Sequence, residues 1–514
     1  MRSPSLALLL PLLGFAAAAP RFERDNGLAG CLRSNGLQPV TQGVSSYEED
    51  SAAYNQRLQP LPSVIFYPSS ASEIATALSC ASQTNTKVSA RGGGHSYASY
   101  GLGGDDGALV IDLGGFRNIT VSGEGVATVG AGNRLGDIYL SLNEQGGWAV
   151  AAGTCPGVGI GGHAGFGGFG LPSRMWGLLS DQVIGYDLVL ANGTILTNLT
   201  RSSNADLFWA LNGAAPNFGI VTAYHLEAHH APATTVIFSY TYTSPRTVDA
   251  ATALSSLSQF ANLSAPANLG IGATIGVDSL VINGVWYGPE AEFGQVIQPL
   301  KDELPGGYDE SQQAFSWIDS AKQLAGDQAL NTQGEMLLSR DSFYAKSLMT
   351  PSTIPIDVAV VEKFLDYLWL SNTTTNWFVE YHLYGGQFSE ITNSTLLDQS
   401  SFGFRDKFFT FQLYASSETY GNPYPDEGVS FVQGMYDTIV DGMTSASPAW
   451  SNDSSSPDGY AGYVNYVDPE LSFDDVKRLY WGQQYDKLAE LKGVYDPDEL
   501  LHNPQGIRPA SSSS

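Results

Sequence analysis

Two nucleophilic side chains, His95 and Cys155, each stand inside a glycine-dense stretch of this 514-residue sequence. His95 belongs to the stretch 91–97, which reads RGGGHSY, and Cys155 belongs to the stretch 153–162, which reads GTCPGVGIGG. Glycine lets the main chain approach a flat or phosphorylated ligand closely. An imidazole and a thiol presented in this way could both bond covalently to one cofactor, so the pair predicts a covalent cofactor site.

Each stretch also has a purely structural interpretation. Either one alone is more simply explained as a tight turn, with His95 a hydrogen-bonded buried histidine and Cys155 a small core residue. The occurrence of both in one chain is much harder to explain as two unrelated turns, and it favours the cofactor interpretation.

The second stretch contains a formal dinucleotide-binding fingerprint, Gly157-x-Gly159-x-x-Gly162, and Asp181 follows at about the right distance. A Rossmann fingerprint must open a helix. Nine of the eighteen residues from 153 to 170 are glycine, a composition that disfavours a helix strongly. We therefore reject a nicotinamide site.

Two further motifs are weaker. The stretch 94–98 resembles a nucleophile elbow, but Ala98 replaces the second glycine and the strand–turn–helix continuation is missing, so a serine hydrolase is not favoured. His225, His229 and His230 lie at the end of a predicted strand without carboxylates at ligand spacing. Solvent-exposed histidines explain them better than a metal site does.

The N-terminal residues 1–19 carry one early cation, an apolar run and small residues at the end, which is typical of a secretory signal peptide. No later segment is long and apolar enough to cross a bilayer, so we expect an exported, soluble protein. Sequons for N-glycosylation fit this route and occur at Asn118, Asn192, Asn198, Asn262, Asn372, Asn393 and Asn452.

The chain has three cysteines, which in an oxidising compartment leaves one thiol over or joined to something else. Cys31 and Cys80 are the natural disulfide pair because Cys155 stands in the special glycine context. The alternative pairings remain open at this point.

The charge balance narrows the ligand classes. Fifty-one acidic residues against 24 basic ones give a net charge of −27, which argues against nucleic acid or an anionic membrane as a partner. Charged residues are only 15% of the chain, whereas tyrosine and tryptophan are plentiful. This composition favours neutral, hydroxyl-rich ligands that stack on aromatic rings.

Short buried elements surround the two glycine stretches. We predict strands at 64–66, 88–90, 110–113 and 127–131, and helices at 73–78 and 134–144. An Asn-Gly turn predicts a hairpin of strands 186–190 and 194–196, followed by a helix at 206–211 and a strand at 219–224. From about 235 to 460 the elements are longer, with site-facing strands expected at 236–242 and 377–384. The stretch 473–491 is amphipathic and helical, and the whole pattern is α+β.

Taken together, RGGGHSY at 91–97 and CPGVGIGG at 155–162 closely resemble the motifs of bicovalent flavoproteins in the berberine-bridge-enzyme-like group. These proteins have the vanillyl-alcohol-oxidase type of FAD fold. Supporting matches are LVIDL at 109–113, NADLFWA at 204–210, NFGIVT at 217–222 and YDP at 495–497, whereas NGAAP at 212–216 departs from the glycine-rich run of many relatives. The chain most resembles the secreted fungal gluco-, chito- and xylo-oligosaccharide oxidases.

The resemblance implies a two-part FAD-binding domain, residues 20–234 and 461–514. A substrate domain of antiparallel sheet plus helices, residues 235–460, would be inserted between the two parts.

The resemblance also implies how FAD is held. His95 would bond to the flavin 8α-methyl carbon and Cys155 to flavin C6. Further cofactor contacts would come from Arg91, Gly92, Gly93, Gly94, Ser96, Val158 and Gly162, with the backbone N–H groups of the three consecutive glycines facing the pyrophosphate. In relatives the residue at position 158 controls oxygen access, and valine favours an oxidase over a dehydrogenase.

The catalytic base would be Tyr466, in a stretch that matches the family's Tyr-x-x-Tyr pattern. It would remove the hydroxyl proton while hydride passes to flavin N5. Because the ordinary pKa of tyrosine is about 10, it needs help from the site. In sugar-oxidising relatives a carboxylate assists, from a strand resembling 377–386. Glu380 is the only acid there, but alternation with Trp377 places Tyr381 on the site-facing side, so the partner stays unassigned.

Tyr97, Trp377 and Tyr463 would contact the substrate. The predicted activity is oxidation of the C1 hydroxyl of a reducing-end oligosaccharide to a lactone, with O2 reduced to H2O2, by a secreted monomer. One alternative is the same fold acting as an oxidase or dehydrogenase on a secondary-metabolite alcohol. A second is a non-catalytic secreted glycoprotein.

Overall fold

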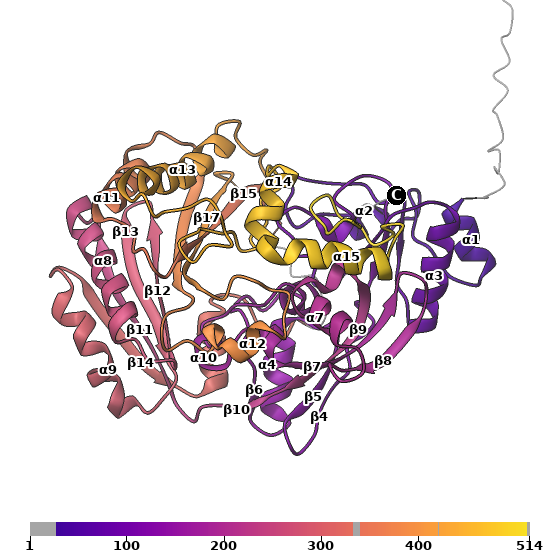
Figure 1. Ribbon diagram of the computed structural model, residues 1–514, viewed down its shortest axis with the longest axis horizontal. Coiled ribbons are helices and arrows are strands. Elements are labelled where there is room, and N and C mark those ends of the chain that lie inside the picture. The colour runs from indigo at the N-terminus through magenta and orange to yellow at the C-terminus, as the bar shows by residue number, and fades with distance from the viewer. Residues whose placement is uncertain (1–26, 333–339, 420, 511–514) are drawn as a thin grey trace, which may run out of the picture.

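The computed structural model describes residues 27–332, 340–419 and 421–510. Figure 1 shows two parts side by side, one with a seven-stranded sheet backed by long helices and one with smaller sheets from the N-terminal half. The C-terminal helices pack against the second part. This mixture of helices and mostly antiparallel sheets confirms the α+β prediction. The predicted signal peptide lies outside the described residues.

The N-terminal half contains three sheets. A parallel one has the order β1 (Val64–Phe66), β3 (Leu109–Asp112), β2 (Val88–Arg91). An antiparallel one has the order β4 (Ile119–Val121), β5 (Val126–Gly130), β9 (Gly219–Glu227), β7 (Val183–Leu190), β8 (Ile195–Leu199). The third pairs β6 (Trp148–Ala149) with β10 (His229–His230). The strands predicted at 64–66, 88–90, 110–113, 127–131 and 219–224 and the Asn-Gly hairpin are confirmed.

The helices of this half are mostly short. They are α1 (Leu28–Ser34), α2 (Tyr47–Asp50), α3 (Ala71–Gln83), α4 (Leu135–Glu144), α5 (Ile160–Gly165), α6 (Ser173–Trp176) and α7 (Ala205–Ala214). The helices predicted at 73–78, 134–144 and 206–211 are therefore confirmed.

Helix α3 shows how sequence sets these elements. Its N-cap Ser70 accepts a hydrogen bond from the Glu73 backbone N–H, an interaction that contributes about 1 kcal/mol of helix stability. Ile74, Ala77, Leu78 and Ala81 fall on one face and are buried. Cys80 on this helix forms a disulfide with Cys31 of α1, with the Cα atoms 5.7 Å apart, which confirms the predicted pair.

The seven-stranded sheet lies in the second half of the chain. Its order is β14 (Asp309–Phe315), β11 (Thr235–Thr243), β13 (Ser279–Trp286), β12 (Leu269–Gly276), β16 (Asn376–Leu383), β17 (Lys407–Ser416), β15 (Phe343–Pro351), and the neighbours are antiparallel. The helices of this region are α8 (Thr247–Leu263), α9 (Glu290–Glu303), α10 (Trp317–Leu324), α11 (Val358–Leu370), α12 (Ser394–Leu397) and α13 (Gly428–Ala446). Helices α8, α9, α11 and α13 line one side of the sheet in Figure 1, which leaves the other side for the site.

Two local expectations need correction. A six-residue helix, α5, begins inside the second glycine stretch, so the high glycine content does not prevent a helix there as we expected. Burial of Ile160 and Ala164 stabilises this short turn. The amphipathic stretch 473–491 is also not one helix, because Gly482, with φ of +51°, separates α14 (Phe473–Val476) and its irregular continuation from α15 (Tyr485–Tyr495).

The C-terminal segment returns to the first part of the fold. Val88 of β2 donates its backbone N–H to the Leu500 carbonyl. Lys492, which is fully buried, donates to the Asp496 carboxylate and to the backbone carbonyls of Asn217 and Leu501. Within the described residues, no helix has both the length and the hydropathy of a membrane span.

Candidate active site

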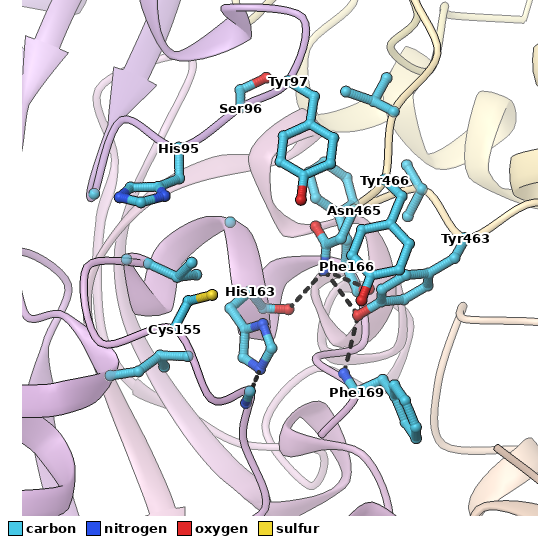
Figure 2. A pocket seen from close by; sticks show the side chains of 18 of the residues that line it. His95, Ser96, Tyr97, Cys155, His163, Phe166, Phe169, Tyr463, Asn465 and Tyr466 are labelled. Carbon is cyan, nitrogen blue, oxygen red and sulfur yellow. Dashed lines mark hydrogen bonds between the residues drawn. The ribbon is translucent and has the colours of Figure 1, made fainter. Parts of the chain in front are cut away.

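A cavity of about 1010 Å³ lies between the first part of the fold and the open side of the seven-stranded sheet. Both glycine stretches, strands β11, β13, β16 and β17, and the segment 463–467 all line it. Figure 2 shows His95 and Cys155 on one side of this cavity and Tyr97 and Tyr466 on the other. The structure therefore brings together the predicted cofactor-binding, catalytic and aromatic residues.

The two glycine stretches pack against each other backbone to backbone. A Cβ atom added to Gly93 would lie 2.2 Å from the Gly159 nitrogen, and one added to Gly159 would lie 2.1 Å from the Gly93 nitrogen. Only glycine tolerates such an approach. This contact sets His95 and Cys155 on the same cavity wall despite their separation in sequence.

The two nucleophiles differ in their tendency to ionise. Burial, and next the positive charge of Arg134, lowers the pKa of His95 to about 4, so its imidazole is neutral with a free lone pair near pH 7. Cys155 has a large accessible surface, but that surface opens into the cavity. There desolvation, and next the charge of Glu380, raises the pKa of its thiol to about 11. Both groups are uncharged nucleophiles aimed at the same space.

Arg91 and Ser96 line the cavity, yet their side chains hold the loop in place. The buried Arg91 guanidinium donates to Asp112 Oδ2 at 2.5 Å and to the Asp50 carbonyl at 2.5 Å. Ser96 Oγ accepts the Tyr100 backbone N–H at 3.1 Å. Their predicted cofactor contacts stay predictions.

His163 of α5 connects the Cys155 loop to the segment that carries Tyr466. Its Nε2 accepts the Gly153 backbone N–H at 3.1 Å, which requires the ring hydrogen to be on Nδ1. Its carbonyl accepts from Asn465 Nδ2 at 3.3 Å (Figure 2). Burial lowers the pKa of His163 to about 4, so the acceptor nitrogen stays unprotonated near neutrality.

Tyr466 stands between two other tyrosines. Its ring is nearly parallel to that of Tyr97, with centroids 6.0 Å apart and 7° between the planes, and perpendicular to that of Tyr463 at 5.1 Å. The hydroxyl of Tyr463 accepts from the Phe169 backbone N–H at 2.9 Å and from Asn465 Nδ2 at 3.1 Å. Tyr463 is only 2% exposed, and its hydroxyl is hydrogen-bonded within the protein. Its ring therefore packs against Tyr466 and holds that side chain in place.

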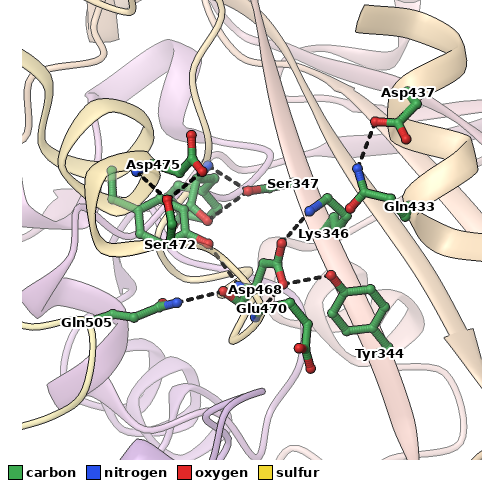
Figure 3. Close-up of polar contacts among 12 residues, drawn as sticks. Tyr344, Lys346, Ser347, Gln433, Asp437, Asp468, Glu470, Ser472, Asp475 and Gln505 are labelled. Atoms are coloured by element: carbon green, nitrogen blue, oxygen red, sulfur yellow. Dashed lines mark hydrogen bonds and ion pairs between the residues drawn. The ribbon is translucent and has the colours of Figure 1, made fainter. Parts of the chain in front are cut away.

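The segment carrying Tyr466 is fixed to β15 by the buried carboxylate of Asp468 (Figure 3). Asp468 accepts from Lys346 Nζ and, at 2.7 Å, from the Tyr344 hydroxyl. Its backbone N–H donates to the Tyr480 hydroxyl, and its carbonyl accepts from Gln505 Nε2, each at 2.8 Å. The Tyr466 segment is therefore tied to both parts of the fold.

Strand β16 presents the opposite face from the one we predicted. Tyr381 lies in the core, stacked on Phe409 with ring centroids 4.1 Å apart, so the expectation that it faces the site is wrong. Trp377 borders the cavity but is only 7% exposed, and its ring packs against Phe431 of α13. The alternate residue Glu380 lines the cavity instead.

The charge of Glu380 reaches Tyr466 through the cavity. Burial, and next the negative charge of Glu380, raises the pKa of Tyr466 well above its ordinary value. His382 Nδ1 lies 3.7 Å from Glu380 Oε2 on the same face of β16. The two residues stand at i and i+2, so they share one face of the strand.

Sequence reasoning also missed Gln412 of β17, which donates from Nε2 to the Tyr97 hydroxyl at 2.7 Å. Polar residues alternate along this strand, and that pattern was the available signal. The three histidines considered for a metal are not simply exposed. His225 pairs with Asp187 at 3.0 Å, while His229 and His230 stack on Trp176 and Trp148. Among the described residues no cluster of three potential metal ligands occurs.

Comparison with known proteins agrees with this geometry. A family model described as FAD binding domain matches residues 62–198, and one described as berberine and berberine like matches residues 462–508. A carbohydrate oxidase of Microdochium nivale is 33% identical over 512 residues, which span 98% of this chain and 99% of that protein. The chain belongs to the berberine-bridge-enzyme-like family. It is an FAD-linked oxidoreductase.

Two further relatives extend the comparison. An FAD-linked oxidoreductase of Metarhizium anisopliae is 32% identical over 519 residues, which span 99% of this chain and 96% of that one. The solved structure of a glucooligosaccharide oxidase from Acremonium strictum matches with a TM-score of 0.87 and 29% identity, covering 94% of this chain and 100% of that one. That enzyme carries a 6-S-cysteinyl, 8α-N1-histidyl FAD.

The residues of this site fit FAD. The close glycine pair, Gly93 and Gly159, leaves backbone rather than side chains along the cavity wall, and Gly162 has no atom within 4 Å of where its Cβ would be. Such backbone can offer N–H donors to a pyrophosphate. His95 and Cys155 supply one neutral imidazole and one thiol on that same wall.

Proposed function

We propose that this FAD-linked oxidoreductase oxidises the C1 hydroxyl of a reducing-end oligosaccharide to a lactone and reduces O2 to H2O2. The observation that carries the proposal is the placement of Tyr466 and Tyr97 across one cavity from His95 and Cys155, with Glu380 also lining that cavity. The likeness to a carbohydrate oxidase and a glucooligosaccharide oxidase supports a sugar as the substrate.

The cofactor is proposed to be bonded through both His95 and Cys155, as in the Acremonium enzyme. Two bonds from one wall fix a flat ring without enclosing it, which leaves the opposite side open for a long substrate. Gly92, Gly93 and Gly94 would supply backbone N–H groups to the pyrophosphate, and Val158 would leave a path for oxygen. The bound FAD supplies the acceptor for a hydride from the substrate carbon.

The protein's own residues handle the proton. Tyr466 accepts the proton of the C1 hydroxyl in its ionised form, and the negative charge of Glu380, which also lines the cavity, makes that phenolate a stronger base. Because burial and the charge of Glu380 both favour the protonated phenol, the phenolate is the minor form near pH 7, but it binds the substrate proton firmly once it has formed. Tyr97, fixed by Gln412, offers a ring face beside Tyr466 for the sugar.

The sheet side of the cavity suits a neutral polyhydroxylated chain. It carries few charged groups. Its uncharged polar groups come from Ser239, Thr274, Asn283, Ser311 and Gln412. Hydroxyl and amide groups can both donate and accept, as sugar hydroxyls require. The proposal includes secretion after removal of residues 1–19, glycosylation, a monomeric state and the two-part FAD domain with its inserted substrate domain.

Peroxide release from the purified protein tests the activity. We expect H2O2 with one or more members of a panel of cello-, xylo- and chito-oligosaccharides, and an aldonic acid as the final product. No peroxide from any of these sugars contradicts the sugar assignment. The alternative, a secondary-metabolite alcohol as the substrate, is tested by assaying peroxide release with a panel of such alcohols.

A further inference from the structure

The ring of His95 is oriented by stacking. Tyr54 stacks on it with ring centroids 4.3 Å apart and 27° between the planes. Among the described residues, no group forms a hydrogen bond with the His95 imidazole. The face of the imidazole is thus covered by Tyr54, while its edge, which carries both nitrogens and the in-plane lone pair, is left free.

Tyr54 is itself held in place from several directions. Its ring packs edge-on against Phe343 of β15, with centroids 5.7 Å apart and 71° between the planes. Its carbonyl accepts the Asp341 backbone N–H at 3.2 Å. The ring therefore has a fixed plane before any ligand binds.

The next residue, Asn55, ties this segment to the loop that carries His95. Asn55 is 1% exposed, and its Nδ2 donates to the Tyr97 carbonyl at 2.7 Å and to the Phe343 carbonyl at 3.0 Å. Its Oδ1 accepts the Phe343 backbone N–H at 3.3 Å. Because Tyr97 is only two residues after His95, the Asn55 amide fixes the loop while the Tyr54 ring fixes the side chain.

We propose that Tyr54 is a positioning residue that orients His95 for its bond to the flavin. This inference rests on the proposed covalent attachment. In that reaction a ring nitrogen of His95 bonds to the 8α carbon of FAD, which loses a hydrogen, and the imidazole loses its N–H proton. The two electrons and two protons reduce the flavin, and O2 reoxidises it with release of H2O2. Attack succeeds only when the nitrogen lone pair points at the carbon, and a ring free to rotate about its side-chain bonds seldom does so.

Site-specific attachment provides the test. Full-length wild type and the variants Tyr54→Phe, Tyr54→Leu and Tyr54→Met are purified, digested and analysed by peptide mass for flavin on His95 and on Cys155. Tyr54→Phe is the matched control because it keeps the ring and loses only the hydroxyl. The two non-aromatic variants remove the stacked face while keeping most of the apolar volume.

We expect Tyr54→Phe to match wild type. In Tyr54→Leu and Tyr54→Met, the ratio of flavin-carrying to bare His95 peptide should fall by about fivefold or more, the factor expected from one lost aromatic contact. Attachment at Cys155 should persist in all variants. This difference between the two sites separates positioning from a general folding defect, which lowers both together.

The possible failures are distinguishable. Wild-type levels at His95 in both non-aromatic variants overturn the role of Tyr54 and leave the proposed function intact. An equal fall at both sites also overturns it, because Tyr54 would then act only on the fold. Absence of flavin from both residues in the wild type overturns the covalent attachment itself, and this inference with it.

Discussion

His163 should make the stability of this protein fall when the pH drops from 7 to 5. Burial lowers its pKa from 6.5 to about 4 by desolvating the charged form, and the neutral ring accepts the Gly153 N–H. Between these two values the unfolded chain binds a proton at this position and the folded chain does not. Stability therefore rises with pH across this window and is complete above the unfolded pKa.

The size of the effect follows from the two pKa values. Protonation of this residue in the unfolded chain lowers the free energy of unfolding by about 2 kcal/mol at pH 5 and by only about 0.2 kcal/mol at pH 7. His163 is 8% exposed, so solvent screening reduces the figure little. The expected loss on going from pH 7 to pH 5 is about 2 kcal/mol.

Urea unfolding of wild type and His163→Gln at pH 7 and pH 5 measures this loss. Glutamine keeps an amide acceptor and does not titrate, whereas every other titrating group, including His95, is common to both proteins. The wild type should lose about 2 kcal/mol more than the variant on acidification. An equal loss in both proteins refutes the assignment of His163 as a buried neutral acceptor.

Four other changes give direct tests. Tyr466→Phe should lower kcat by about 10²- to 10⁴-fold in steady-state peroxide assays while the flavin spectrum stays unchanged; a smaller fall means that another group takes the proton. Glu380→Gln removes a charge that raises the pKa of Tyr466, so the acidic limb of the kcat profile should move to lower pH, and an unmoved limb contradicts the electrostatic coupling. Lys346→Met leaves the Asp468 carboxylate buried without its cation, so the free energy of unfolding in denaturant should fall by about 3–5 kcal/mol. The double variant Lys346→Met/Asp468→Leu should restore much of this loss if the pair matters through its charges. Gly93→Ala should lose flavin and stability, because its Cβ would lie 2.2 Å from the Gly159 nitrogen. In the control Gly161→Ala the new Cβ meets only Tyr224 Oη at 4.0 Å, so its free energy of unfolding should stay within about 0.5 kcal/mol of the wild-type value.

The cofactor side of the site was largely predictable because its chemistry is local in sequence. The glycines at 92–94 and at 157, 159, 161 and 162 predict close backbone contact, and the structure shows that contact between Gly93 and Gly159. The role of Arg91 was not visible, since its partner Asp112 becomes a neighbour only through the parallel register of β2 and β3. The stacking of Tyr54 on His95 likewise depends on two segments that no local pattern joins.

We predicted the wrong face of β16 to line the cavity, because both faces of this strand carry residues that can be buried. We assigned the aromatic residues to the site, but the helix-covered face of the sheet requires an apolar surface. Trp377 packs there against Phe431 of α13, and Tyr381 packs against Phe409. The cavity takes the polar alternates, Glu380 and His382. A strand between a core and a polar cavity is largely buried on both sides, so alternation gives the period without giving the direction.

These two sides differ in what a substitution can do. On the cofactor side the close contact is made by backbone at Gly93 and Gly159, so a side chain at either position disrupts the fold as well as the site. On the sheet side the strands are held by backbone ladders whose hydrogen bonds do not depend on which side chain projects into the cavity. Substitutions at Glu380, Gln412 or Asn283 can therefore change the ligand while the cofactor site stays intact. Relatives near 30% identity that share one fold and carry different substrate names fit this division.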